Sequence, residues 1–163
     1  MKSMKTCLPV FVAVLLLVGG GSGAGAGAVR PCQAIVARGV LPVWARAGFS
    51  EARPRVPHVL GRSGGIVAIL FAEPLYAPPT PKRNNKILWV ARTPLAAPAD
   101  LRISAQRMKG RLRAGKPVSR VVRGGPGPSI IDLPAPGCWR FTLRWARHTD
   151  TLDLVYRTPP RPA

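Results

Sequence analysis

Acidic side chains are scarce in this sequence. Its 163 residues include 6 Asp and Glu against 25 Lys and Arg, which gives a formal net charge of +19. Apart from Asp150 and Asp153 the acids are scattered, so no motif places two carboxylates together for general acid–base catalysis. The positive excess attracts polyanions such as nucleic acid, anionic lipid or cell-wall polymers. A GC-rich coding bias produces the same arginine-rich composition, so the charge alone leaves both explanations open.

Histidine and long apolar runs are also lacking. The two imidazoles, His58 and His148, are isolated in the sequence, and no C-x-x-C or H-x-x-x-H spacing occurs. We therefore predict no bound metal and no cofactor. The apolar run at residues 8–18 is shorter than the roughly 20 residues that a membrane-spanning helix needs. We therefore predict no transmembrane segment in the mature chain.

The first residues have the three-part layout of a secretory signal peptide. Lys2 and Lys5 precede the apolar run, and residues 19–28 are small, with two A-x-A cleavage sites. We predict that residues 1–28 are cleaved, that residues 29–157 form one folded domain, and that the proline-rich residues 158–163 are a disordered tail. A membrane anchor, the alternative, would need apolar residues where the glycines stand. The protein is thus expected to be secreted or associated with the cell envelope.

Cleavage of the signal peptide would remove Cys7 and leave only Cys32 and Cys138. Two cysteines in an oxidising compartment predict one disulfide, and two free buried thiols are the alternative. The disulfide would close a loop of over a hundred residues, for which the chain-entropy treatment gives about 4–5 kcal/mol.

Residues 136–145 alternate strictly between two faces. Trp139, Phe141, Leu143 and Trp145 share one face, which is typical of a half-buried β-strand. Cys138 belongs to the opposite face, so its sulfur would point away from the aromatic residues. We expect the disulfide to fasten the N-terminal segment across the sheet and not to cross the core.

Further short strands are predicted with a turn signal about every ten residues. Residues 32–46 contain a proline and predict at most an edge strand, residues 48–62 and 109–115 predict loops, and residues 74–85 predict a stiff exposed connector. The pattern favours a single all-β domain, an immunoglobulin-like antiparallel β-sandwich, over a small barrel. The predicted strands are residues 65–71 (buried on both faces), 86–92, 100–107, 118–123, 129–133, 136–145 and 152–156.

A basic window gives the candidate binding site. Seven cations fall within residues 107–123, and no acid occurs between Asp100 and Asp132. Together the seven would form one positive patch that binds phosphate-rich polymers with a strong salt dependence. The alternative is a solvated loop. The window has no aromatic residue on which bases could stack, so nucleic acid is disfavoured and anionic envelope polymers or lipid head groups are favoured. The seven are Arg107, Lys109, Arg111, Arg113, Lys116, Arg120 and Arg123.

A second pattern points to a different class of function. Gly61-Arg62-Ser63-Gly64-Gly65 matches G-x-S-x-G, and Asp132 and His148 follow in the order of a catalytic triad. A nucleophile elbow needs a strand before the serine and a helix after it, whereas here a proline-rich loop precedes and a strand follows. We therefore predict a non-enzymatic binding or structural module of the cell envelope, with a small secreted hydrolase using Ser63 as the alternative.

Residues 84–90 and 125–139 resemble a group of small exported bacterial proteins. The most specific piece is Pro-x-x-Gly-Cys-Trp at residues 134–139, and the resemblance extends roughly from Val43 to Tyr156. It implies a β-domain that carries a signal peptide, and it brings no activity, substrate or catalytic residue.

Overall fold

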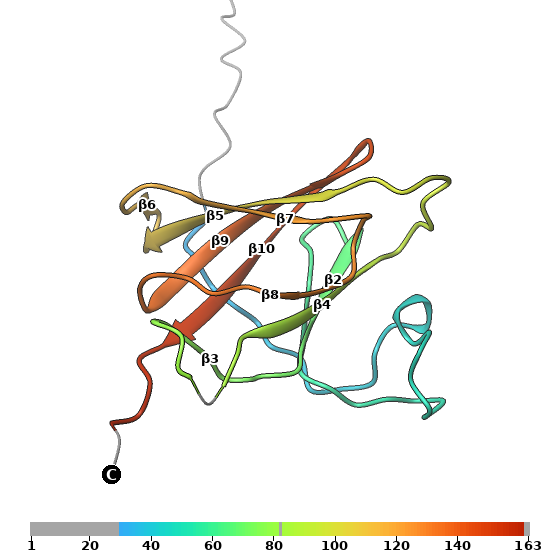
Figure 1. Ribbon diagram of the computed structural model, residues 1–163, viewed down its shortest axis with the longest axis horizontal. Helices are drawn as coiled ribbons and strands as arrows, with labels where there is room; N and C mark the ends of the chain where they lie inside the picture. Colours follow the sequence, from blue (N-terminus) through green and yellow to red (C-terminus); the bar gives the residue numbers. More distant parts are fainter. Residues whose placement is uncertain (1–29, 82, 162–163) are drawn as a thin grey trace, which may run out of the picture.

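The computed structural model describes residues 30–81 and 83–161, which form two packed β-sheets (Figure 1). Apart from the 3-10 turn η1 (Val43–Ala45), all the regular structure in these residues is β-strand. The prediction of an all-β domain is confirmed at the level of a two-sheet sandwich. The predicted signal peptide, residues 1–28, lies outside the described residues.

The smaller sheet has four strands in the order β1-β2-β4-β8, all antiparallel to their neighbours. The β1–β2 turn is the glycine-rich segment at residues 61–65. The strands are β1 (His58–Leu60), β2 (Ile66–Leu70), β4 (Lys86–Ala91) and β8 (Pro128–Ile130).

The larger sheet has six strands, of which β10, β9 and β5 are the long central ones. Both β6 and β7 pair with β5, whereas β3 pairs in parallel with the end of β10. The strands are β3 (Leu75–Tyr76), β5 (Leu101–Lys109), β6 (Leu112–Arg113), β7 (Val118–Val122), β9 (Gly137–Trp145) and β10 (His148–Arg157).

The core between the sheets is built by the aromatic face predicted for residues 136–145. Trp139, Phe141 and Leu143 are each at most 2% exposed and pack in the same cluster as Trp89 from β4. The ring centroids of Trp89 and Phe141 lie 6.1 Å apart, which joins the two sheets through an aromatic pair.

Strand β2 is buried on both faces, as its unbroken apolar run predicts. Val67 and Ile69 point away from the inter-sheet core and pack against Leu41 and Ala45. Residues 41–45 therefore cover the outer face of the four-stranded sheet. This cover explains why the run is apolar on both sides, whereas a strand with one exposed face alternates apolar and polar residues.

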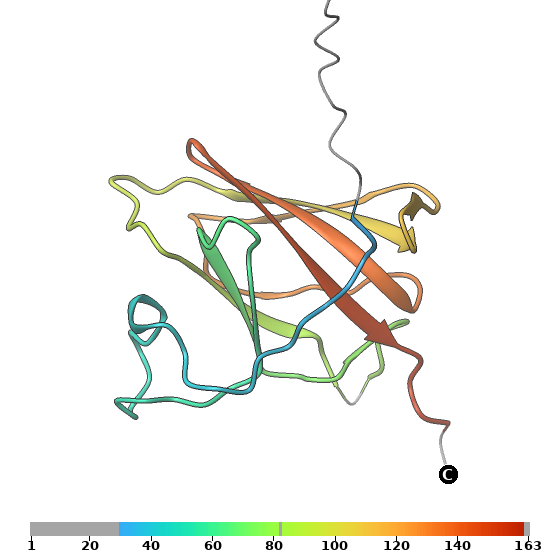
Figure 2. The same cartoon turned by 180° about the vertical axis from the view of Figure 1, so that it is seen from behind.

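The outer face of the six-stranded sheet is crossed by residues 30–37, which we call the N-terminal strap (Figure 2). Cys32 forms a disulfide with Cys138 on β9, with a Cα–Cα distance of 6.0 Å. The Gln33 N–H donates to Asp153 on β10, and Ala37 pairs with His58 on β1. The predicted disulfide and its position outside the core are both confirmed.

Three predictions about the connecting segments are wrong. The segment at residues 48–62 contains β1, and the loop at residues 109–115 contains β6. The segment at residues 74–85 is not an exposed connector, since it contains β3 and ends at Asn85, which is 2% exposed. The Asn85 side chain exchanges hydrogen bonds with the Tyr76 backbone, and Leu75 and Ala77 are buried in the core, so polar and apolar contacts together fix this segment.

Candidate polyanion-binding site

A cavity of about 750 Å³ opens on the outer face of the six-stranded sheet. Its floor consists of outward-facing side chains of β5 and β9, including Ser104 and Gln106 from β5 and Thr142 from β9. These residues alternate with the core residues of the same strands, so the alternation that buries the aromatic residues also directs polar groups outward.

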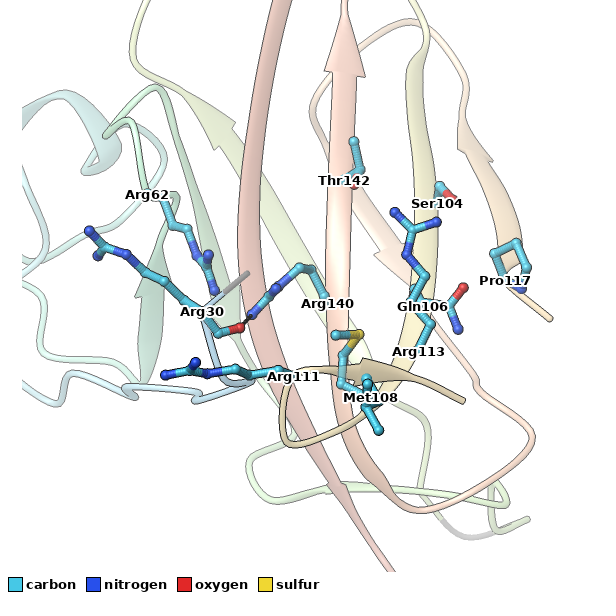
Figure 3. Close-up of a pocket in the computed structure, with 11 residues that line it drawn as sticks. Arg30, Arg62, Ser104, Gln106, Met108, Arg111, Arg113, Pro117, Arg140 and Thr142 are labelled. Carbon is cyan, nitrogen blue, oxygen red and sulfur yellow. Dashed lines mark hydrogen bonds between the residues drawn. The ribbon is translucent and has the colours of Figure 1, made fainter. Parts of the chain in front are cut away.

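Among residues 30–81 and 83–161, five arginines line this cavity and no acidic residue does. In Figure 3, Arg30 and Arg111 extend in the same direction, Arg62 and Arg140 point toward one another, and Arg113 extends along the floor strands. The five come from the strap (Arg30), the β1–β2 turn (Arg62), the β5–β6 hairpin (Arg111 and Arg113) and β9 (Arg140).

Asp153 neutralises part of this charge from beneath the strap. Its carboxylate accepts hydrogen bonds from Arg62 Nη2 at 2.7 Å, from Arg140 Nε at 2.9 Å and from the Gln33 N–H at 3.0 Å. Burial by itself raises the pKa of Asp153, but Arg140, the Gln33 N–H and the Arg62 charge outweigh it and hold that pKa below its usual value. One carboxylate thus pairs with two of the five arginines and cancels one of their two positive charges.

The remaining three arginines have no carboxylate partner within 4 Å in the part of the chain that the structure describes. They are Arg30, Arg111 and Arg113, and all three are exposed. A guanidinium group offers donors only, in a planar fork that matches phosphate or carboxylate oxygens. The cavity is therefore positive and rich in hydrogen-bond donors.

The seven cations predicted as one patch are divided by the sheet. Arg111 and Arg113 line the cavity, and the other five do not. Arg107 has the parity of the core residues of β5, with its Nε beside Gly137, and Arg123 faces Asp100 at 3.9 Å. Arg120 donates to the Ser119 and Asp132 carbonyls, while Lys109 and Lys116 are exposed outside the cavity.

Sequence reasoning missed Arg30, Arg62 and Arg140. Arg62 and Arg30 reach the cavity through contacts across the fold, which a window of neighbouring residues cannot show. Arg140 had a usable signal, because it shares the parity of Cys138 on β9 and thus the face that the strap crosses.

The G-x-S-x-G turn surrounds a carboxylate. The Ser63 and Gly65 N–H groups donate to the two Asp150 oxygens, each at 2.9 Å, and a Cβ at Gly61 would overlap the same carboxylate. The glycine spacing of this motif therefore fits the binding of the buried Asp150 by backbone amides.

The other residues of the hydrolase alternative lie in different contacts. Asp132 accepts a hydrogen bond from the Asn85 amide, and His148 stacks on Trp145 with ring centroids 5.4 Å apart. Ser63 lies between two strands, with no helix after it. Hydrolysis at Ser63 stays the alternative to the predicted binding module, and Ser63→Ala would test it against any esterase activity.

Within residues 30–81 and 83–161, no three His, Cys, Asp or Glu side chains meet in a group that could hold a metal ion. None of the helical structure described is long and apolar enough to cross a membrane. No protein-family model, curated protein or solved structure matches this chain.

Proposed function

We propose that this protein is an exported, non-enzymatic module of the cell envelope that binds anionic polymers in the arginine-lined cavity. The observation that carries the proposal is the lining itself, in which five arginines from four separate segments meet with no acid among them. Three of the five have no carboxylate partner among the described residues, and repulsion between these like charges costs stability unless an anion binds there.

The lining also favours a class of anion. It presents guanidinium groups above a floor of hydroxyl and amide side chains, which suits the oxygen-rich groups of phosphates. No aromatic side chain of the described residues lines the cavity, so unpaired bases would find no surface there on which to stack. Envelope polymers with phosphate or similar groups are therefore favoured over nucleic acid, and lipid head groups are the other source of the same chemistry.

Export is part of the same proposal. The Cys32–Cys138 disulfide is of the kind that persists in oxidising compartments, and the sequence before Arg30 has the layout of a signal peptide. Membership of the group of small exported bacterial proteins that residues 84–90 and 125–139 resemble would agree with this location.

We further propose that the sandwich is of the immunoglobulin-like type. The order β2-β4-β8 corresponds to strands A, B and E of that fold, and β5-β9-β10 corresponds to strands C, F and G. Strand β7 then takes the position of the extra strand beside C in variable-type domains. The disulfide differs, because it joins β9 to the strap and does not join the two sheets.

Charge reversal at the cavity tests the binding proposal. Arg111→Glu with Arg113→Glu should weaken the binding of immobilised long-chain polyphosphate at least tenfold and reduce its salt dependence. The matched control is Arg53→Glu with Arg55→Glu, which makes the same change in net charge at exposed positions that line no part of the cavity. Equal loss of binding in both variants would show that only net charge matters and would contradict the proposed site.

Vesicles that contain phosphatidylglycerol distinguish the two sources of the anion. We expect the protein to bind soluble polyphosphate in preference to these vesicles. The opposite preference would assign the cavity to lipid head groups.

A further inference from the structure

The outer face of the six-stranded sheet continues past the cavity in ordered rows. Strands β5 and β9 pair so that Gln106 lies opposite Arg140, Ser104 opposite Thr142, and Arg102 opposite Arg144. The first two of these pairs lie in the cavity floor, whereas Arg102 and Arg144 lie beyond it.

The middle row consists of hydroxyl groups on four adjacent strands. Ser119 on β7 pairs with Ser104, which pairs with Thr142, which in turn pairs with Thr151 on β10. A hydroxyl both donates and accepts, so this row can complete the hydrogen bonds of an oxygen-rich chain that guanidinium groups hold on either side.

The outermost row places two like charges directly opposite each other. Arg102 and Arg144 are both exposed, and neither has a carboxylate within 4 Å among the residues the structure describes. Like charges at directly opposite positions of an antiparallel pair are destabilising. An anion bound between the two guanidinium groups would turn this repulsion into attraction.

The spacing of the arginine rows favours an extended ligand over a single small anion. Arg140 and Arg144 are four residues apart on one strand, which corresponds to about 13 Å between their Cα atoms, and hydrogen bonds to Asp153 hold the Arg140 guanidinium group in place. Successive outward-facing positions along the strand repeat at about 6.6 Å, so a chain with acidic groups along its length can touch all three rows.

We infer that this face binds a linear phosphate polymer that runs along β5 and β9 from the cavity to the Arg102–Arg144 pair. The inference rests on the proposed function and adds to it the length and direction of the ligand. The cavity holds one end of the bound stretch of polymer, and Arg102 and Arg144 bind a phosphate group that a short ligand in the cavity would not reach. The row of hydroxyl groups forms hydrogen bonds with the phosphate oxygens between these two places.

A chain-length series tests this inference. The probes are orthophosphate, tripolyphosphate and long-chain polyphosphate, with affinities measured by calorimetry on the disulfide-bonded protein. Affinity should rise steeply from tripolyphosphate to the long chain. The variant Arg102→Gln with Arg144→Gln should weaken long-chain binding about tenfold and change tripolyphosphate binding less than twofold.

The matched control is Arg53→Gln with Arg55→Gln, which removes the same charge elsewhere. If the control weakens long-chain binding as much as Arg102→Gln with Arg144→Gln, the extended site is wrong while the cavity site stands. The proposed function fails as well if Arg111→Glu with Arg113→Glu leaves the binding of long-chain polyphosphate unchanged. Tighter binding of single-stranded DNA or of phosphatidylglycerol vesicles than of long polyphosphate would overturn the assignment of the ligand.

Folding of the variant can be checked independently. Arg102 and Arg144 are exposed and repel each other, so the melting temperature of Arg102→Gln with Arg144→Gln should not fall below that of the wild type. Long polyphosphate should raise the melting temperature of the wild type more than that of this variant. An equal rise in both proteins would contradict the extended site.

Discussion

The two outer faces of the sandwich differ in how far other segments of the chain cover them. On the four-stranded sheet, Val67 and Ile69 point outward and are fully buried, because residues 41–45 pack over them. On the six-stranded sheet the outward positions of β5 and β9 include hydroxyl, amide and guanidinium groups, and the N-terminal strap crosses only part of them. The first face adds a second hydrophobic cluster to the fold, and the second keeps a polar, positive surface open to ligands.

If the proposed function holds, this difference separates the residues that stabilise the sandwich from the residues that bind the ligand. The same period-two alternation operates in both sheets, and what differs is whether the chain has an apolar segment to lay over the outer face. Substitutions on the covered face should therefore change the free energy of unfolding, and substitutions on the open face should change binding.

The largest expected effect is on the covered face. Ile69→Ala removes a fully buried side chain between β2 and residues 41–45 and should lower the free energy of unfolding by about 2–5 kcal/mol. Thr142→Val, which replaces a side chain on the open face by one of nearly the same shape, should change the free energy of unfolding by no more than about 0.5 kcal/mol. Chemical denaturation measures both, and similar losses in the two variants would contradict the proposed division.

The strap is the next test, since it crosses the open face and is joined to β9 by the disulfide. Replacing Cys32 and Cys138 together with alanine should cost about 2–4 kcal/mol, because the disulfide closes a loop across 106 residues of sequence. Ile69→Ala combined with this change should be close to additive, because the two sites lie on opposite outer faces. A strongly non-additive result would mean that the two faces are coupled.

A smaller effect is expected where the β1–β2 turn meets β10, between the two sheets. Gly61→Ala places a Cβ against the Asp150 carboxylate and should cost about 1–3 kcal/mol. Gly39→Ala is the control, since a Cβ at that position has no heavy atom within 4 Å. Thermal unfolding of the two variants tests this contact. An unchanged melting temperature for Gly61→Ala would show that the close approach of Gly61 to Asp150 does not contribute to stability.

The smallest effect concerns the ion pairs of Asp153 under the strap. The folded pKa of Asp153 lies below its unfolded value of about 4, so its stabilisation is fully present above that pH and is lost as the pH falls toward the folded pKa. The change should be on the order of 1 kcal/mol, because burial of the charges offsets much of the pairing. In a plot of the free energy of unfolding against pH, Asp153→Asn should reduce the slope on the acid side. An unaltered slope would mean that other carboxylates cause the loss of stability at low pH.

The long strands could be predicted because their side chains alternate over many residues. Residues 101–109 and 137–145 show this clearly, and β2 was recognisable from its apolar run. By contrast, β1 and β3 have three and two residues, lie close to prolines, and exist because another strand pairs with them. Such strands depend on partners far away in the sequence, so no local pattern marks them.

The candidate site was predictable only in part, for a related reason. Arg111 and Arg113 were found because they lie close together in the sequence, whereas Arg30 and Arg62 meet them only through the disulfide and the β1–β2 turn. The window also combined residues from different faces. Applying the alternation of β5 to Arg107 would have placed it with the core residues and excluded it from the patch.

The disulfide has a consequence for the resistance of the protein to proteolysis. It encloses strands β1 to β8 in one covalent ring, since Cys32 precedes β1 and Cys138 lies within β9. A protease that cuts once in an exposed loop, such as residues 46–53 or 92–99, would open the ring without releasing a fragment. The nicked protein would remain one molecule, with its sheets still paired and its arginine-lined face intact.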